Sequence, residues 1–132
     1  MLSKKQTVLV IEDDPGLLYS ITEALEMEGF EVVSSTNSSP LHSLDIINPD
    51  LIILDHFLGN SLGQTICKEL KEDFEASHIP VILISGTSNL EEIAFACKAD
   101  AYLKKPFSGK LLVAEVKKLY AQLIKIQVTP IL

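Results

Sequence analysis

The chain of 132 residues contains no arginine and no tryptophan, and it has only two cysteines, Cys67 and Cys97. Without arginine it lacks the guanidinium group that recognises phosphate through two hydrogen bonds at once. Two cysteines are too few for a disulfide framework, so we expect both thiols to pack as small apolar groups in a reducing compartment. The formal net charge of −7 argues against direct nucleic-acid binding.

Long apolar segments are absent as well. No apolar run is long enough to cross a bilayer, and no secretory signal segment is recognisable. We therefore expect no membrane contact and a cytoplasmic location. The three histidines are scattered, without the ligand spacing of a structural zinc site. With 47% hydrophobic residues, the chain is nevertheless apolar enough to form one domain with a full core.

Short apolar runs alternate with segments of helical periodicity. Continuous apolar runs that are rich in β-branched residues are typical of strands buried on both faces of a parallel sheet. The predicted strands are Thr7–Ile11, Glu31–Ser35, Leu51–Asp55, Ile79–Ile84 and Asp100–Lys104, of which the second is weaker than the others and the fifth is short. Apolar residues recur at helical spacing in five further segments, among them Ser38–Ile47 and the last, from about Phe107 to Ile124. This βα repeat predicts an α/β domain with helices on both faces of one parallel sheet.

Several residues mark where the helices begin and end. Asp14 is predicted to be the N-cap of the first helix, with Pro15 at the first helical position and Gly29 just past the end. Ser88 and Glu91 have the spacing of a capping box, which predicts the start of the fourth helix.

Polar side chains stand at the ends of four predicted strands. Glu12 and Asp13 follow the first strand, Asp55 ends the third, Ser85 follows the fourth and Lys105 follows the fifth. Because the carboxyl ends of parallel strands lie along one edge of a sheet, we expect these groups to meet there. Crowded carboxylates disfavour one another's ionisation, and a divalent ion relieves that repulsion. Hard oxygen ligands of this kind suit Mg²⁺.

The same side chains predict phosphoryl-transfer chemistry. Mg²⁺ would neutralise an incoming phosphoryl group, and Asp55 would be the nucleophile that forms an aspartyl phosphate. Lys105 would bring a positive charge to the phosphoryl oxygens, and Ser85 would donate a hydrogen bond to one of them. Taken singly, a carboxylate, a serine or a lysine at a strand end is more often a helix cap, a turn residue or a solvated surface group. Their joint placement at successive strand ends favours the chemical interpretation.

The sequence resembles the receiver domain of bacterial two-component response regulators from about Thr7 to Leu123. The matching stretches are Val8–Pro15, Pro49–Asp55, Pro80–Ser85 and Ala101–Phe107. The resemblance implies a flavodoxin-like, doubly wound sheet of five parallel strands in the order 2-1-3-4-5, with five helices. We assign residues 1–124 to the receiver domain and leave residues 125–132 as an unassigned C-terminal tail.

The resemblance implies a role for each residue of the phosphorylation site. Asp55 corresponds to the phosphoacceptor, Asp13 to the direct Mg²⁺ ligand, and Glu12 to an acidic neighbour that acts on the ion through water. The backbone carbonyl of Phe57 corresponds to a further metal ligand. Lys105 corresponds to the lysine of the family motif that follows the fifth strand. Such receivers accept their phosphoryl group from a phosphohistidine on a sensor histidine kinase or a phosphotransfer protein. They catalyse the transfer to themselves and hydrolyse the product slowly.

The resemblance also implies a switch and an output face. Ser85 corresponds to the switch hydroxyl and Tyr102 to the switch aromatic residue, which swings inward as the hydroxyl moves to the phosphoryl group. Helical spacing puts Phe95 on the solvent side of the fourth helix. We therefore predict an output face on the fourth helix, the fifth strand and the fifth helix, through which the chain binds a partner or forms a homodimer.

Two places depart from the family pattern. The loop His56–Gly63 lacks the usual Pro-Gly pair and is expected to be less rigid. Lys98 stands where the family usually has glycine after the fourth helix. We expect either a positive φ at Lys98, at a cost of about 1 kcal/mol, or a different end to that helix.

Three other functions compete with a phosphorylatable signalling switch. A pseudo-receiver that binds partners without phosphorylation would not require the complete set of chemical residues. A flavin-binding electron carrier on the same fold would need a hydroxyl- and glycine-rich phosphate loop after the first strand, where this chain has acidic residues. A metal-dependent phosphatase is the most distant alternative.

Overall fold

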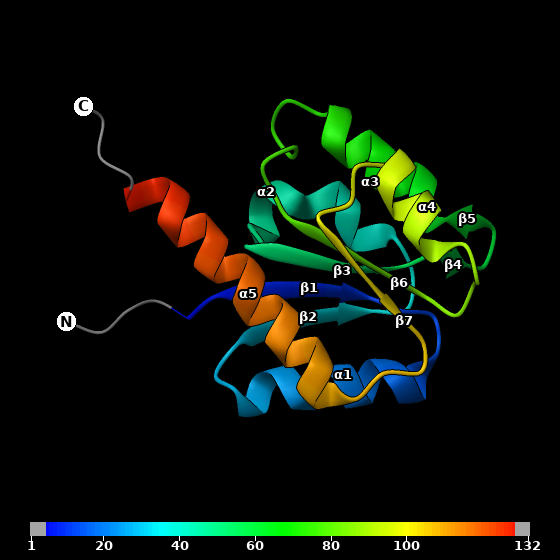
Figure 1. Ribbon diagram of the computed structural model, residues 1–132, viewed down its shortest axis with the longest axis horizontal. Coiled ribbons are helices and arrows are strands. Elements are labelled where there is room, and N and C mark those ends of the chain that lie inside the picture. Colours follow the sequence, from blue (N-terminus) through cyan, green and yellow to red (C-terminus); the bar gives the residue numbers. More distant parts are fainter. Residues whose placement is uncertain (1–4, 129–132) are drawn as a thin grey trace.

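Five parallel strands form the main sheet of the computed structural model, which describes residues 5–128. The strands are β1 (Thr7–Ile11), β2 (Glu31–Ser35), β3 (Leu51–Asp55), β6 (Val81–Ser85) and β7 (Ala101–Lys104). Their order in the sheet is β2-β1-β3-β6-β7 (Figure 1). Since β4 and β5 lie outside this sheet, the order is the predicted 2-1-3-4-5, and the flavodoxin-like arrangement is confirmed.

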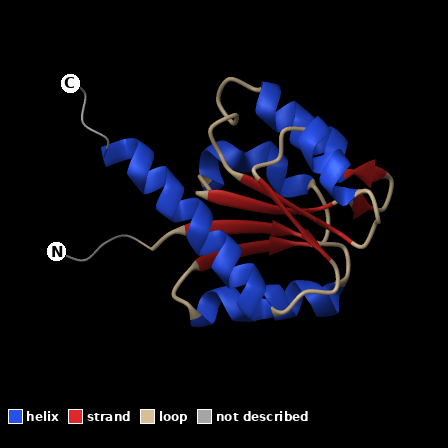
Figure 2. Ribbon diagram, viewed as in Figure 1, coloured by secondary structure: helices blue, strands red, loops and turns tan. Residues whose placement is uncertain are grey.

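Helices cover both faces of the sheet, as Figure 2 shows. They are α1 (Pro15–Met27), α2 (Leu44–Ile47), α3 (Gly63–Glu72), α4 (Leu90–Ala96) and α5 (Gly109–Val128), with a 3-10 helix η1 (Ser39–Ser43) before α2. The helices α1 and α5 pack on one face, whereas α2, α3 and α4 pack on the other (Figure 1). Within residues 5–128, no helix is long and apolar enough to span a membrane.

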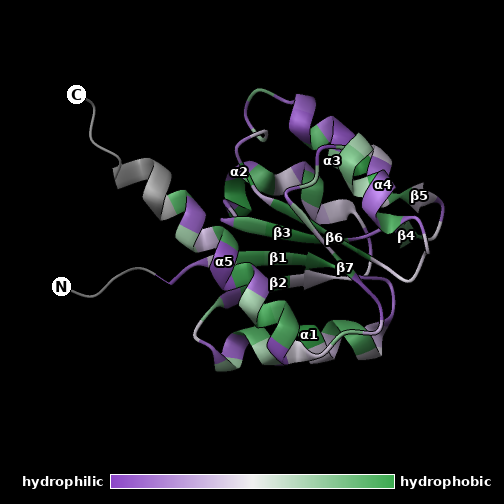
Figure 3. Ribbon diagram, in the orientation of Figure 1, coloured by the Kyte–Doolittle hydropathy of each residue, from purple (hydrophilic) through white to green (hydrophobic). Residues whose placement is uncertain are grey.

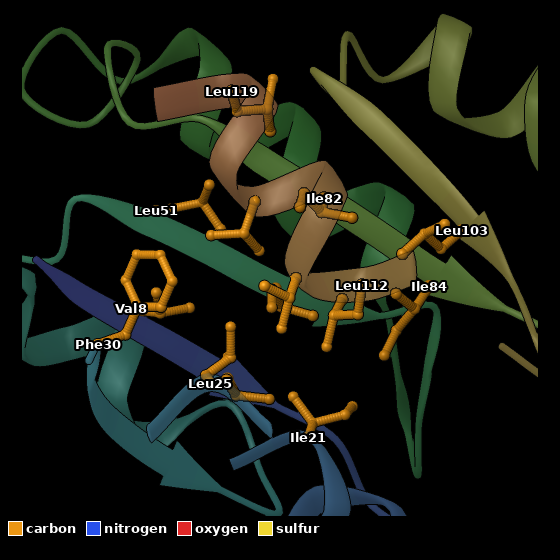
Figure 4. Close-up of a cluster of buried hydrophobic side chains, with 14 of the residues drawn as sticks. Val8, Ile21, Leu25, Phe30, Leu51, Ile82, Ile84, Leu103, Leu112 and Leu119 are labelled. Atoms are coloured by element: carbon orange, nitrogen blue, oxygen red, sulfur yellow. The ribbon is translucent and has the colours of Figure 1, made fainter. Parts of the chain in front are cut away.

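Alternation along the strands produces two apolar cores, one on each face of the sheet. Val8 and Val10 of β1 belong to the core beneath α1 and α5, and Leu9 and Ile11 belong to the core on the opposite face. Figure 4 shows how β1, β3, β6 and β7 meet α1 and α5 in the first core. Because β1, β3 and β6 are apolar on both faces, they appear uniformly hydrophobic in Figure 3, whereas the helices are mixed.

The first helix begins and ends where the sequence predicts. The Asp14 side chain accepts a hydrogen bond from the backbone N–H of Leu17 at 3.1 Å, and Pro15 occupies the first helical position. The helix is followed by Gly29 with φ 92°, a conformation that glycine adopts at no steric cost. Lys98 after α4 has φ 62°, which confirms the first of the two expectations for this position.

Three predicted segments differ in detail. Ser38–Ile47 divides into η1 and the four-residue α2, because apolar residues three apart suit a 3-10 helix as well as an α-helix. The capping-box prediction is wrong: α4 has its N-cap at Asn89, which makes no side-chain cap bond and instead accepts a hydrogen bond from the Thr87 hydroxyl at 2.7 Å. The segment Phe57–Leu62, predicted as loop, contains the small hairpin of β4 (Phe57–Leu58) and β5 (Ser61–Leu62).

The last helix starts later and ends later than predicted. Ser108 caps its first turn, since the Ser108 hydroxyl oxygen accepts a hydrogen bond from the N–H of Leu111 at 3.0 Å. The helix continues to Val128, so the first part of the unassigned tail is helical. Residues 129–132 lie outside the described residues.

Candidate functional site

The strand ends that carry polar residues meet at one edge of the main sheet. Ile11, the last residue of β1, is aligned with Leu54 of β3, and Asp55 is aligned with Ile84 of β6. Ser85 is aligned with Lys104 of β7. Because neighbouring strands end in register, Glu12, Asp13, Asp55, Ser85 and Lys105 come to the same edge, as predicted.

Three carboxylates form a cluster at this edge. Glu12, Asp13 and Asp55 each offer an oxygen, and these oxygens lie within 4.8 Å of one another. Glu12 and Asp55 are 0% and 2% exposed, whereas Asp13 is exposed to solvent. The buried pair is therefore shielded from water, and Asp13 faces the direction from which an ion or a substrate would arrive.

Lys105 supplies the positive charge that balances the buried pair. Its ammonium nitrogen lies 2.7 Å from Oε1 of Glu12 and 3.2 Å from Oδ1 of Asp55. The Lys105 backbone N–H donates to the carbonyl oxygen of Ser85 at 2.8 Å, so the lysine is fixed to the end of β6. The lysine thus joins the ends of β1, β3, β6 and β7 in one polar network.

Burial controls protonation within the cluster. Loss of solvent raises the pKa of Glu12 to about 7, although hydrogen bonds from the Asp14 backbone N–H and from Lys105 oppose the rise. Burial also raises the pKa of Asp55, while hydrogen bonds with Glu12 and then Asp55 lower the pKa of Asp13. Burial lowers the pKa of Lys105, but its hydrogen bond to Glu12 and the charge of Asp55 outweigh this and raise it overall. Burial therefore favours the protonated forms of Glu12 and Asp55 when no cation is present.

The cluster has the donor set of a hard divalent cation. Oε1 of Glu12 is buried, and its close partner is the Lys105 ammonium at 2.7 Å, so a cation bound here would share this oxygen with the lysine. Three carboxylates that converge on one point are ligands that Mg²⁺ prefers. The backbone of Phe57 also lies against the acceptor, since its N–H is 3.4 Å from Oδ1 of Asp55. Metal ligation by the Phe57 carbonyl stays a prediction.

The predicted switch residues, Ser85 and Tyr102, lie on the neighbouring strands β6 and β7, and Phe95 lies on α4. Ser85 is buried at the end of β6, where its hydroxyl oxygen accepts a hydrogen bond from the backbone N–H of Thr87 at 3.2 Å. Tyr102 on β7 is 41% exposed, and Phe95 on α4 is 87% exposed, in agreement with its predicted position on the solvent side. Phe95 and Tyr102 line one hollow of about 530 Å³ between α4, β7 and α5.

Two residues beside the acceptor were missed by the sequence analysis. His56 is buried directly after Asp55, and its Nδ1 has no hydrogen-bond partner among the described residues. Gly63 donates its N–H to the carbonyl oxygen of His56 at 2.6 Å, and a Cβ at Gly63 would collide with the carbonyl oxygen of Asp55. The close approach at Gly63 could have been predicted from the sequence, because a glycine stands at the junction between the loop and α3, where α3 approaches the end of β3.

Comparison with known families gives one assignment for most of the chain. The family model described as the response regulator receiver domain matches residues 8–117. The heme response regulator HssR of Staphylococcus saprophyticus is 36% identical over 114 residues, which cover 84% of this chain and 50% of that protein. The phosphate regulon transcriptional regulatory protein PhoB of Pseudomonas aeruginosa is 33% identical over 115 residues, with coverage of 85% and 50%. The chain thus spans about half the length of these curated relatives.

Solved structures share the fold over nearly the whole chain. A putative response regulator from Chloroflexus aurantiacus has a TM-score of 0.84 and 27% identity, and the match covers 89% of this chain and 99% of that one. The signal receiver domain of a histidine kinase from Syntrophus aciditrophicus has a TM-score of 0.82 and 27% identity, with coverage of 96% of both chains.

Proposed function

The chain belongs to the response regulator receiver domain family, and from this we propose that it accepts a phosphoryl group on Asp55 and alters its protein contacts in response. The observation that supports the proposal most strongly is the environment of Asp55. This carboxylate is buried at the end of the central strand, within 4.8 Å of the Glu12 and Asp13 carboxylates and 3.2 Å from the Lys105 ammonium. A carboxylate that served only as a helix cap would not need an acidic pair and a lysine beside it.

The donor in this proposal is a phosphohistidine on a sensor histidine kinase or a phosphotransfer protein. An oxygen of Asp55 attacks phosphorus, the N–P bond breaks, and the imidazole leaves and takes up a proton. Lys105 neutralises charge on the phosphoryl oxygens, and the Ser85 hydroxyl donates a hydrogen bond to one of them. Mg²⁺ held by Glu12, Asp13 and Asp55 would supply further positive charge to the transferred group. Self-phosphotransfer and slow autodephosphorylation belong to this proposal.

The pseudo-receiver alternative is not favoured. It requires no phosphorylation chemistry, yet the acceptor, the acidic pair, Ser85 and Lys105 are all present and meet at one edge of the sheet. A flavin-binding carrier is disfavoured because carboxylates occupy the end of β1, where a flavin phosphate would have to bind. A metal-dependent phosphatase gains no support from the family match.

We assign the output to the α4–β7–α5 face, defined by Phe95, Tyr102 and the hollow that they line. Lys118 lines this hollow and Lys104 on β7 is exposed, so both supply positive charge in an otherwise acidic chain, whereas the Lys117 ammonium is paired with Glu28 at 2.9 Å. The face would bind an acidic partner surface or a second copy of the receiver once Asp55 is phosphorylated. The net charge of −7 supports a receiver that does not itself contact nucleic acid or an anionic membrane surface. Two free, buried cysteines support a cytoplasmic location.

Intact-mass spectrometry tests the proposal. With acetyl phosphate and Mg²⁺, the wild-type chain should gain the mass of one phosphoryl group, and chelation of the metal should abolish the gain. The Asp55→Ala variant should gain nothing under the same conditions. Equal phosphorylation of the wild type and this variant would remove Asp55 from its proposed role.

A further inference from the structure

A second hollow lies on the face of the sheet that carries α2, α3 and α4. It is a groove of about 640 Å³ between the η1–α2 segment and α3, closed at one end by β5. Its apolar lining consists of Leu41, Leu44, Leu62, Ile66 and Leu70. This groove is separate from the phosphorylation site and from the α4–β7–α5 face, because it shares no lining residue with either.

One wall of the groove is incompletely packed. The segment from η1 to α2 is divided into a five-residue and a four-residue helix, and neither helix contains a buried side chain. Leu41 and Leu44, which line the groove, pack only partly against the core. The crossover that should cover this part of the sheet therefore leaves apolar surface accessible.

The opposite wall is a continuous stripe along α3. The lining residues at positions 62, 65, 66, 69, 70 and 73 follow the spacing of one helix face from the N-cap of α3 to its C-cap. This stripe runs beside the ten residues of α3, or about 15 Å, which is the length of nearly three helical turns. A groove of that shape accommodates another helix, which would pack its apolar face against the stripe.

The charge at the edge of the groove is negative. Glu69 and Asp73 line it, and the basic side chain that lines it with them is His42, since no lysine among the described residues does so. The Lys71 ammonium is held elsewhere, at 2.6 Å from Asp100 and 2.9 Å from the carbonyl oxygen of Ile79, while Lys68 lines the other side of α3. Neither carboxylate forms an ion pair with a described residue, and both complement a cationic side chain on an incoming helix.

We propose that this groove docks an amphipathic helix of a partner protein. The helix would set apolar side chains against Leu62, Ile66 and Leu70, and lysine or arginine against Glu69 and Asp73. The docking does not require phosphorylation, so it can fail or succeed independently of the proposed role of Asp55. Nucleic acid is a poor occupant because its phosphates would meet the two carboxylates.

A peptide titration followed by NMR tests this assignment. The probe is a synthetic helix-forming peptide with leucine on one face and flanking lysines, and the matched probe has glutamate in place of lysine. We expect the lysine peptide to shift backbone amide signals of η1, α2, β5 and α3, and the glutamate peptide to bind at least tenfold more weakly. The double variant Glu69→Lys, Asp73→Lys should lose at least tenfold in affinity for the lysine peptide.

The control is the double variant Glu23→Lys, Glu26→Lys on α1, which has the same change of charge on the opposite face of the sheet. It should keep the wild-type affinity, and circular dichroism should confirm that both double variants are folded. Equal losses of affinity in both double variants, or amide shifts spread over the whole surface, would show that the peptide binds by unspecific charge attraction. Either result would overturn the proposal. Groove signals that shift with protein concentration alone would make a second copy the occupant, which also contradicts it.

Discussion

Lys98 holds a backbone conformation that residues with a side chain rarely adopt, with φ 62°. Its side chain is exposed, so replacement by glycine removes the steric cost without loss of packing. We expect Lys98→Gly to raise the free energy of unfolding by about 0.5 to 1 kcal/mol, because glycine's greater freedom in the unfolded chain offsets part of the gain. Urea-induced unfolding measures the change.

Asn48 offers a matched control, since it also has a positive φ, of 49°. Asparagine tolerates this region better than lysine, so Asn48→Gly should give a smaller gain than Lys98→Gly. An unchanged unfolding midpoint for Lys98→Gly would contradict the strain at this position.

Glu12 should make Mg²⁺ binding depend on pH. Its pKa rises in the folded protein from 4.5 to about 7, so this group stabilises the metal-free fold most below pH 4.5 and loses that contribution as the pH rises through 7. Mg²⁺ favours the ionised carboxylate, so binding should release a proton. We expect affinity for Mg²⁺ to fall about tenfold from pH 8 to pH 6.

Isothermal titration calorimetry in two buffers with different ionisation enthalpies measures both the affinity and the released proton. Glu12→Gln should bind Mg²⁺ more weakly, with little dependence on pH over this range. Equal wild-type affinity at pH 6 and pH 8 would show that Glu12 does not titrate in the binding reaction.

The positions of the site residues could be predicted from the sequence, but their pairing could not. Asp55, Ser85 and Lys105 meet because parallel strands end at one edge, and that follows from strand periodicity and the family order. The sequence did not indicate that Lys105 would lie nearer to Glu12 than to Asp55, since side-chain rotamers decide this contact. The buried His56 was missed because a single histidine after a strand has no periodic signal.

At the level of elements, the junction between β3 and α3 depends on the absence of a side chain at Gly63. A Cβ there would collide with the backbone of Asp55 and His56. Gly63→Ala should therefore destabilise the fold by about 1 to 3 kcal/mol, as overpacking does, and should slow phosphorylation by displacing the end of β3. Thermal unfolding and the rate of phosphorylation by acetyl phosphate are the measurements.

Gly16→Ala is the control for this change, because a Cβ at Gly16 comes no nearer than 3.8 Å to Asp14. In the first turn of α1, alanine should stabilise the helix by up to about 1 kcal/mol. If Gly63→Ala is as stable and as rapidly phosphorylated as Gly16→Ala, the close approach of α3 to the acceptor is not required.

The main elements could be predicted because their signals are long, whereas the small ones lack such signals. The strands β1, β3 and β6 are continuous apolar runs between turns. The helix α1 has recognisable start and stop residues at its two ends. The hairpin strands β4 and β5 have two residues each, too few to show any alternation. The division of Ser38–Ile47 into η1 and α2 was missed because its apolar spacing fits both kinds of helix.

For the whole molecule, we expect activation to act through the α4–β7–α5 face. With Mg²⁺ and beryllofluoride, a mimic of the phosphoryl group, the wild type should change its dimerisation or its binding to a partner protein. Phe95→Ala should weaken the activated assembly about tenfold, because truncation of an exposed aromatic anchor removes most of its contact area. Analytical ultracentrifugation and partner pull-down, with and without beryllofluoride, measure the effect.

Phe74→Ala is the matched control, since Phe74 is 95% exposed but lies after α3, outside the α4–β7–α5 face. It should leave the activated assembly unchanged. Equal behaviour of Phe95→Ala and the wild type under activation would move the output to another surface.

The central claim is that one buried carboxylate, brought together with an acidic pair and a lysine by the order of the strands, carries the phosphoryl group. Borohydride reduction after treatment with acetyl phosphate and Mg²⁺ tests it most directly, because it converts an aspartyl phosphate into homoserine. Peptide sequencing by mass spectrometry should then find homoserine in place of Asp55 and at no other aspartate. Homoserine at Asp13 or Asp14, or its complete absence from a chain that has gained a phosphoryl group, would contradict the account.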